Sequence, residues 1–380
     1  MDFTLSADEI AVVEAAEQVS RDVLAVHASA ADAGAFPAAS IAALGEAGLC
    51  GIKIAKQYGG LGSTQLAFCS AIRAMAGACA STAVTVAVTN MVADMIEKFG
   101  SDAQKQAHLR NLARGVYSAG SFALSEPSAG SDAAALRTRA EKIEGGYRLN
   151  GSKLWITSGD RAQVVLVLAK TDPTLGAKGI TAFLVQADNP GLSIGRHEEK
   201  LGLRGSSTVS LNFTDCIVAE SDLLGRLGGG FEVAMTALDG GRCGIGAQAL
   251  GMGFATLAAT SQHLQKHQAA NREQGTEQMA QFRLADMTLR LEAAWLLVQR
   301  AAWLRDQGKK MTREAAMAKV NATEAANFAC QTAMQILGPT GLDARHPVSR
   351  ALRDVRVSRI YEGTSEIQRL VIARSLTASL

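Results

Sequence analysis

Apolar residues recur at helical spacing in the first and last parts of the chain, whereas short β-branched runs dominate between them. Leu284, Met287, Leu291 and Trp295 are typical of the helical parts, because residues three to four apart share one helix face. The runs at 164–168 and 181–185 are typical of strands. The pattern predicts a helical domain over 1–117, a β domain over 118–228 and a helical domain over 229–380.

Local signals predict where several helices begin. Ser6-x-x-Glu9 and Ser101-x-x-Gln104 are capping boxes, in which the side chains of both residues bond to the first turn of the helix. A further apolar face at Ile41, Leu44, Leu49 and Ile52 predicts a helix that continues to the glycine-rich turn at 58–62. The first 117 residues are thus expected to form a helical bundle.

Turn signals organise the rest of the chain. Asn150-Gly151 between two apolar runs predicts a β-hairpin, since both residues tolerate the positive φ of a two-residue turn. Thr312 is expected to cap a helix that runs to Leu337 and stops at Gly338-Pro339. Four such helices in the last 150 residues predict a four-helix bundle.

Composition narrows the class of protein. The chain has 380 residues, 48% of them apolar, and a formal charge of +2, which suits two or three folded units and disfavours a nucleic-acid partner. The acidic N-terminus does not resemble a signal peptide, and no apolar run reaches about 18 residues, so we expect a cytoplasmic protein outside membranes. Six scattered cysteines without a C-x-x-C pair are expected to be reduced core thiols.

Common enzyme motifs are missing from the sequence. It contains no G-x-G-x-x-G after a strand, no P-loop, no G-x-S-x-G and no H-E-x-x-H. His263 and His267 are four residues apart on a predicted helix, but no third ligand stands at matching spacing. We therefore expect no metal site.

Two loops carry less ordinary chemistry. The segment 122–132 combines small residues and hydroxyls, which can hold a planar ring or a phosphate, although a domain linker would have a similar composition. In the segment 359–369, Thr364 or Ser365 can cap a helix from Ile367 to Ser375, and Ser365-x-x-Gln368 completes a capping box.

This placement leaves Glu362 just outside a helix start. Partial desolvation beside Ile360 and Tyr361 would raise the pKa of Glu362 toward that of a general base. A surface glutamate that interacts with the helix dipole is the alternative interpretation.

These two loops and the segments 149–159, 201–208 and 335–338 resemble the acyl-CoA dehydrogenase family, in the same order along the whole chain. The resemblance implies a mainly α fold with an inserted β domain: an N-terminal helical domain, a middle antiparallel β-barrel or sheet, and a C-terminal four-helix bundle with the catalytic glutamate. It also implies non-covalent FAD and a homo-oligomer, a tetramer more often than a dimer.

The reaction of that family is α,β-desaturation of an acyl-CoA thioester, in which a glutamate removes the α-proton and flavin N5 takes the β-hydride. Glu362 matches this glutamate. The other position that the family uses for the base, directly before an arginine, here holds Gly241 before Arg242, and glycine cannot accept a proton.

The same matching assigns ligand contacts. Trp155 would cover one flavin face and Thr157 would bond near N5. The FAD contacts implied are Phe122, Leu124, Ser125, Gly130, Ser131, Trp155, Ile156, Thr157, Gln278, Gln335, Gly338, Gly363, Thr364 and Glu366. The substrate contacts implied are Ser131, Asp239, Arg242, Tyr361 and Gly363.

The chain departs from the family pattern in one region. An Arg-x-x-Phe-Gly motif that reaches the FAD of a neighbouring subunit is replaced at His267, Ala270 and Asn271, and Pro339 replaces a glycine. We expect weaker FAD binding or a compensating contact from Arg272.

The resemblance favours a short- or branched-chain acyl-CoA dehydrogenase of fatty acid or amino acid catabolism that passes electrons to an electron-transfer flavoprotein. Two alternatives stay open. One is a flavoenzyme of the same fold that acts on a carrier-protein-bound acyl group or hydroxylates an amine as an oxygenase, although Glu362 argues against the oxygenase. The other is a non-catalytic oligomer.

Overall fold

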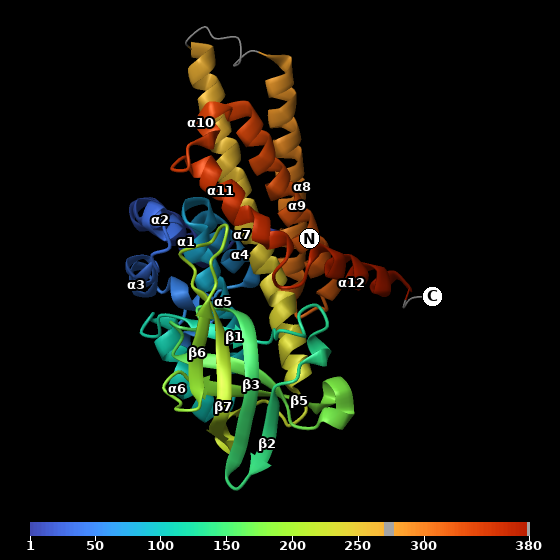
Figure 1. The fold of residues 1–380 in the computed structure, drawn as a ribbon. Coiled ribbons are helices and arrows are strands. Elements are labelled where there is room, and N and C mark those ends of the chain that lie inside the picture. Colours follow the sequence, from blue (N-terminus) through green and yellow to red (C-terminus); the bar gives the residue numbers. More distant parts are fainter. Residues whose placement is uncertain (270–276, 378–380) are drawn as a thin grey trace.

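The computed structural model describes residues 1–269 and 277–377, with a sheet at one end of an elongated set of helices (Figure 1). The first third of the chain is helical, as predicted, and packs beside the sheet and the long C-terminal helices. Its helices are α1 (Ala7–Val19), α2 (Ala25–Asp32), α3 (Ala38–Glu46), α4 (Gln65–Ala78), α5 (Ala80–Phe99) and α6 (Asp102–Ala113).

The capping boxes at Ser6 and Ser101 are both formed and begin α1 and α6. The prediction that the third helix continues to Ile52 is wrong, because α3 ends at Glu46 and Gly48 turns the backbone with φ +74°. A left-handed glycine is a common way to end a helix. Leu49 and Ile52 are still buried, but in the 3₁₀ turn and bend that follow.

The middle of the chain forms one eight-stranded sheet of order β6-β7-β3-β2-β4-β5-β8, with β1 paired to β4. The pairs are antiparallel except β1–β4 and β2–β4. The strands are β1 (Gly120–Ala123), β2 (Arg139–Ile143), β3 (Gly146–Thr157), β4 (Val164–Lys170), β5 (Ile180–Gln186), β6 (Leu192–His197), β7 (Thr208–Ala219) and β8 (Leu223–Leu224).

The predicted hairpin at Asn150-Gly151 is wrong, because β3 runs unbroken through both residues. The turn lies earlier, where Gly145 has φ +74° between the paired residues Ile143 and Gly146. Gly151 instead lies at a register shift against β7, and a Cβ there would lie 2.6 Å from Thr138 Oγ1. Glycine is therefore required because β3 closely approaches Thr138, the residue before β2, rather than for a turn.

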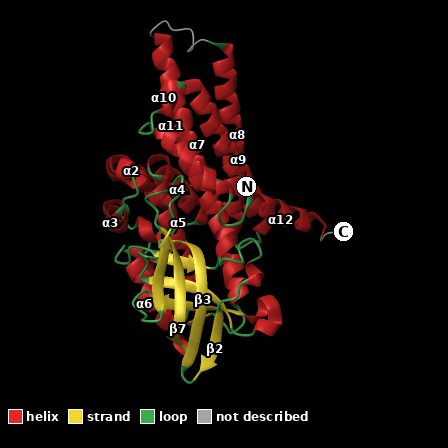
Figure 2. Cartoon of the chain, in the orientation of Figure 1, coloured by secondary structure: helices red, strands yellow, loops and turns green. Residues whose placement is uncertain are grey.

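The last third of the chain forms the helical bundle (Figure 2), whose helices are α7 (Gly230–Ala269), α8 (Gln278–Asp306), α9 (Thr312–Leu337), α10 (Pro339–Leu342), α11 (Pro347–Val355) and α12 (Ser365–Thr377). The end of α9 at Leu337 is confirmed. Thr312 does not cap α9: it is the first helical residue, and its hydroxyl donates to Asp239 Oδ2 at 2.6 Å.

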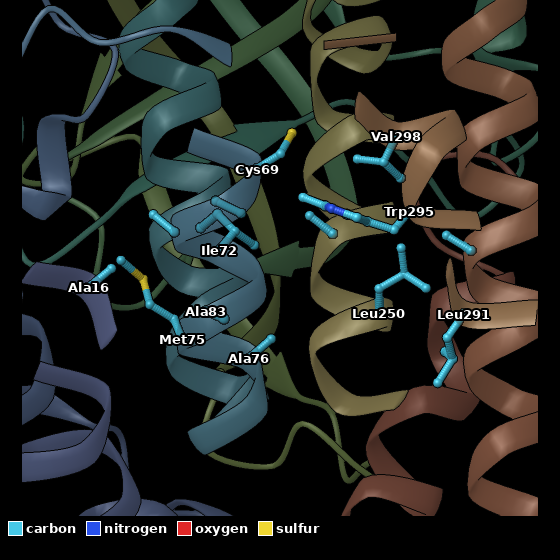
Figure 3. Close-up of a cluster of buried hydrophobic side chains, with 14 of the residues drawn as sticks. Ala16, Cys69, Ile72, Met75, Ala76, Ala83, Leu250, Leu291, Trp295 and Val298 are labelled. Atoms are coloured by element: carbon cyan, nitrogen blue, oxygen red, sulfur yellow. The ribbon is translucent and has the colours of Figure 1, made fainter. Parts of the chain in front are cut away.

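The N-terminal and C-terminal helices share one hydrophobic core. Ile72 of α4 faces Leu250 of α7 and Trp295 of α8 across this core, while Met75 lies on the other side of α4, toward Ala16 of α1 (Figure 3). All six cysteines are free and buried, as predicted. Among the described residues, only α7 has the length and hydropathy of a membrane span, but 72% of its most apolar stretch is buried inside the protein.

Candidate active site

Glu362 lies on a strained turn between α11 and α12. Its backbone is left-handed, with φ +51°, and Gly363 follows with φ +93°. Left-handed conformations are uncommon for residues other than glycine, and they concentrate at functional sites. Thr364 then caps α12, because its hydroxyl accepts from the Ile367 N–H at 3.3 Å. Of the two predicted caps, Thr364 or Ser365, the structure uses Thr364, and the helix runs from Ser365 to Thr377 rather than from Ile367 to Ser375.

The predicted capping box between Ser365 and Gln368 is wrong. Ser365 Oγ donates to Glu324 at 3.2 Å, and Gln368 Nε2 donates to backbone carbonyls of the Glu362 turn. Both side chains are buried, so tertiary partners replace the local cap.

The Glu362 carboxylate packs against the backbone of α7. A Cβ on Gly241 would lie only 2.2 Å from Glu362 Oε2 and 3.2 Å from Met91 Sδ. Oε2 is buried and, within the described residues, has no hydrogen-bond partner. Desolvation raises the pKa of Glu362 to about 7, and the positive charges of Lys319 and Arg242 oppose that rise. A carboxylate in this state can accept a proton near neutral pH.

Two cations, Arg242 and Lys319, interact with this carboxylate, and the neighbouring Tyr361 is anchored beside it. Arg242 is nearly fully buried and donates from Nη1 to Asp239 Oδ1 at 2.7 Å, while its Nε has no partner among the described residues. Lys319 of α9 is fully buried and donates to the Gly363 carbonyl at 2.8 Å. Tyr361 donates from its hydroxyl to Gln248, so it is anchored beside the turn.

The loop after β1 is tied to β3 by a buried ion pair. Lys153 is completely buried, and its Nζ donates to Glu126 Oε1 at 2.8 Å and to the Leu124 carbonyl at 3.1 Å. The Glu126 carboxylate also accepts from the backbone N–H groups of Arg137 and Thr138, at 2.6 and 2.9 Å. These bonds hold the pKa of Glu126 below its usual value despite burial.

A second tie between the same segments leaves Trp155 exposed. The Leu154 N–H donates to the Ser125 carbonyl at 2.9 Å, and Ser121 Oγ donates to the Thr157 carbonyl at 2.7 Å. Trp155 sits at a register shift with φ +60°, and 59% of its surface is exposed. An exposed indole beside a loop of small residues offers a flat apolar face, which fits a planar aromatic ring.

The loop after β1 and the turn that carries Glu362 contact the same hydrophobic cluster. Leu124 from the loop and Met91 from beside Glu362 belong to it, and Phe122 and Tyr361 pack against it. Ile156 is buried, while Gly130 and Ser131 lie exposed, with open space around Gly130. Glu366 is exposed in the first turn of α12.

Gln278, Gln335 and Gly338 form a separate group at the far end of the bundle. Gln278 begins α8, and Gln335 accepts from Arg283 at 2.9 Å near the end of α9, next to α10 (Figure 1). Residues 242 to 269 span about 40 Å of α7 at 1.5 Å per residue. One chain therefore does not bring these residues to Glu362.

The region that departs from the family pattern lies partly outside the described residues. Ala270, Asn271 and Arg272 lie outside the described residues. His267 lies on α7, with its ring centroid 4.3 Å from that of His263. Pro339 begins α10 directly after Gly338, which has φ +54°. Among residues 1–269 and 277–377, no group of three or more His, Cys, Asp or Glu side chains is placed to hold a metal.

Sequence reasoning missed the two buried lysines, Lys153 and Lys319. A lysine inside an apolar run, as in Ala315-Ala316-Met317-Ala318-Lys319-Val320, is the one signal that could have found Lys319. Lysine is almost never fully buried unless paired, so a lysine on a predicted buried face indicates a polar partner.

Comparison with known proteins matches all three parts of the chain. Residues 6–116, 121–216 and 228–377 match the N-terminal, middle and C-terminal domains of acyl-CoA dehydrogenase. The human mitochondrial short-chain specific acyl-CoA dehydrogenase is 45% identical over 345 residues, which cover 90% of this chain and 84% of the relative.

Solved structures agree. Butyryl-CoA dehydrogenase from Megasphaera elsdenii has a TM-score of 0.96 and 36% identity, over 99% of this chain and 100% of the other. PigA, solved with FAD and proline, has a TM-score of 0.94 and 28% identity over the full length of both chains. The three matching domains and these relatives show that the chain belongs to the acyl-CoA dehydrogenase family, whose cofactor is FAD.

Proposed function

We propose that this flavoprotein catalyses α,β-desaturation of a short- or branched-chain acyl-CoA thioester, with Glu362 as the base. The observation that carries the proposal is the buried, unpartnered Oε2 of Glu362 against Gly241, together with a pKa of about 7. The division of the chain into 1–117, 118–228 and 229–380 is part of the same proposal.

Glu362 would remove the α-proton of the thioester onto Oε2. Desolvation favours the neutral acid that results, while Lys319 and Arg242 keep enough of the carboxylate ionised before the reaction. The backbone N–H of Glu362 would donate to the thioester oxygen, where negative charge develops as the proton leaves. FAD, when bound, supplies the acceptor for the hydride from the β-carbon.

The residues proposed to hold FAD come from both site segments. Trp155 would cover one face of the ring, Leu124 and Ser125 would lie at its edge, and Thr157 would donate a hydroxyl. These side chains fit a flat ring because the indole is exposed on a bulge that Lys153 and Leu154 tie to the loop. The N-terminus of α12, after Gly363 and Thr364, suits a diphosphate.

The thioester arm would be held beside α7. Asp239 is partly exposed and fixed by Arg242 and Thr312, so it can accept a hydrogen bond from an amide of the arm. Ser131 is exposed on the loop at the other side. Arg242 is nearly fully buried, and its charge acts on Glu362, so we propose that it affects the substrate mainly through the base.

We also propose a homotetramer in the cytoplasm that donates electrons to an electron-transfer flavoprotein. The far-end group of Gln278, Gln335 and Gly338 can serve a flavin only if that flavin belongs to another copy. Large apolar side chains on α8 are also more than half exposed, at Met279, Phe282, Leu289 and Leu296. Such a row favours burial against a second copy.

Anaerobic titration with a panel of acyl-CoAs tests the reaction. Loss of the visible flavin absorbance is expected with at least one short or branched acyl chain. Glu362→Gln, which keeps the shape of the side chain, should slow this bleaching by about 10²–10⁴-fold. Bleaching of Glu362→Gln at the wild-type rate would show that Glu362 is not the base.

A carrier-protein-bound acyl group is a second candidate substrate, supported by the likeness to the prolyl acyl carrier protein oxidase AnaB, which has a TM-score of 0.92 and 29% identity. Bleaching by an acyl-carrier thioester but by none of the acyl-CoAs would favour it. A purified protein that stays colourless with added FAD would instead favour the non-catalytic oligomer.

A further inference from the structure

The carbonyl of Gly363, next to Glu362, accepts from two fully buried side chains. Lys319 Nζ of α9 donates to it at 2.8 Å, and Gln368 Nε2 of α12 donates at 3.0 Å. Gln368 Nε2 also lies 3.4 Å from the Glu362 carbonyl. The turn that carries Glu362 is therefore held by hydrogen bonds from two helices, α9 and α12, that are separated in sequence.

These hydrogen bonds stabilise a backbone conformation that is unfavourable for a residue other than glycine. Glu362 has φ +51° without being a glycine, and such a conformation persists only where the surrounding structure over-determines it. A Cβ on Gly363 would lie 2.5 Å from Gln368 Nε2, so the amide is packed tightly on the turn. The two donors supply the contacts that keep the turn left-handed and its carboxylate against Gly241.

Lys319 also adds charge. The charged groups that face Glu362 are Lys319 from α9 and Arg242 from α7, and both lower its pKa against desolvation. On its own segment, the neighbouring Tyr361 hydroxyl is held by Gln248. Lys319 in turn faces Glu362, Arg242, Glu324 and Glu366, and burial lowers its pKa to about 8. Gln368 also holds the Glu362–Gly363 turn, but it is uncharged and so has no such effect on the Glu362 pKa.

We propose that Lys319 and Gln368 are positioning residues for the base: both hold the Glu362–Gly363 turn through the Gly363 carbonyl, and of these two residues only Lys319 also acts on Glu362 through its charge. The proposal rests on the proposed role of Glu362. Lys319 both holds the turn and supplies a positive charge, whereas Gln368 only holds the turn, so a comparison of the two residues separates these effects.

The test uses FAD-loaded enzyme and a 3-thia-acyl-CoA, a thioester with sulfur in place of the β-carbon. This probe can lose an α-proton but has no β-hydride to transfer. Its deprotonation is followed by long-wavelength absorbance as a function of pH. The variants are Lys319→Met, Lys319→Gln, Gln368→Leu and Glu362→Gln, with FAD content and thermal unfolding measured for each.

Loss of the ammonium should move the midpoint of probe deprotonation upward by about 1 pH unit in Lys319→Met, since a nearby opposite charge shifts a carboxyl pKa by about 1–3 units. Lys319→Gln should show the same shift, because it keeps a donor for Gly363 and lacks the charge. Gln368→Leu should keep the wild-type midpoint but lower the rate of flavin reduction by normal substrate. If Lys319→Met fails to fold, Lys319→Gln carries the same expectation.

A wild-type midpoint in both Lys319 variants would overturn the proposal, as would an equal shift in Gln368→Leu. Glu362→Gln distinguishes this failure from failure of the proposed function. If Glu362→Gln deprotonates the probe like the wild type, Glu362 is not the base at all. If it does not, while the Lys319 variants stay unchanged, only the role of Lys319 is wrong.

Discussion

Gly241→Ala tests whether the position of the Glu362 carboxylate controls the rate. The added methyl group would lie 2.2 Å from Glu362 Oε2, and contacts under 3.0 Å essentially never occur. Met91 Sδ at 3.2 Å limits where the methyl group could move. The carboxylate must therefore shift by about 1 Å, because the helix backbone is held by its own hydrogen bonds.

The expected loss of rate follows from this shift. A misplacement of about 1 Å can cost about 10²-fold in rate, which corresponds to about 2.7 kcal/mol of activation free energy. Alanine is a better helix former than glycine by about 0.5–1 kcal/mol. The free energy of unfolding should therefore not fall, so activity and stability should separate.

Rapid-mixing measurements of anaerobic flavin bleaching at saturating acyl-CoA would give the rate, and chemical denaturation would give the stability. Gly77→Ala in α4 is the matched control, since its added methyl group would meet no atom closer than 3.4 Å. Bleaching of Gly241→Ala at the rate of Gly77→Ala would refute the reasoning that the carboxylate is fixed against α7.

Three further predictions follow from buried charges. The acid limb of kcat/KM should have its midpoint near the raised Glu362 pKa of about 7; a midpoint near 4.5 in the pH profile would contradict this. Lys153→Met removes the cation that pairs with the buried Glu126 carboxylate, so the free energy of unfolding should fall by about 3–5 kcal/mol. FAD titration should also give a higher Kd. Lys142→Met, which breaks an exposed ion pair, should change neither quantity. Burial raises the folded-state pKa of Asp354 from 3.8 to about 6, so its contribution to stability is complete below about pH 4 and is lost as pH rises through 6; Asp354→Asn should flatten the pH dependence of unfolding in that window, and an unchanged slope would count against it.

Features that depend on a few neighbouring residues could be predicted from the sequence. The helix starts after Ser6 and Ser101 are correct because a capping box is complete within four residues. The end of α9 at Leu337 is correct because Gly338 and Pro339 act on the adjacent backbone. The family motifs are also contiguous, so they could be found without any knowledge of contacts.

Predictions failed where a distant partner outweighed a local signal. Asn150-Gly151 is a good turn sequence, but pairing of β3 with β7 and close packing against Thr138 keep it inside a strand. Thr312 could cap a helix, but Asp239, 73 residues away, takes its hydroxyl. Cross-strand and interhelical contacts contribute more than one local hydrogen bond, so they decide the outcome.

The candidate site divides in the same way. The amino-acid sequence by itself determined the segment that carries Glu362 and the segment that carries Trp155, because each is a contiguous motif. Only the tertiary structure decided that Glu362 packs on Gly241 and that Lys319 holds its turn. Burial, desolvation and the resulting proton affinity arise from atoms that meet only after α7, α9 and α12 have packed together, and no local pattern records that meeting.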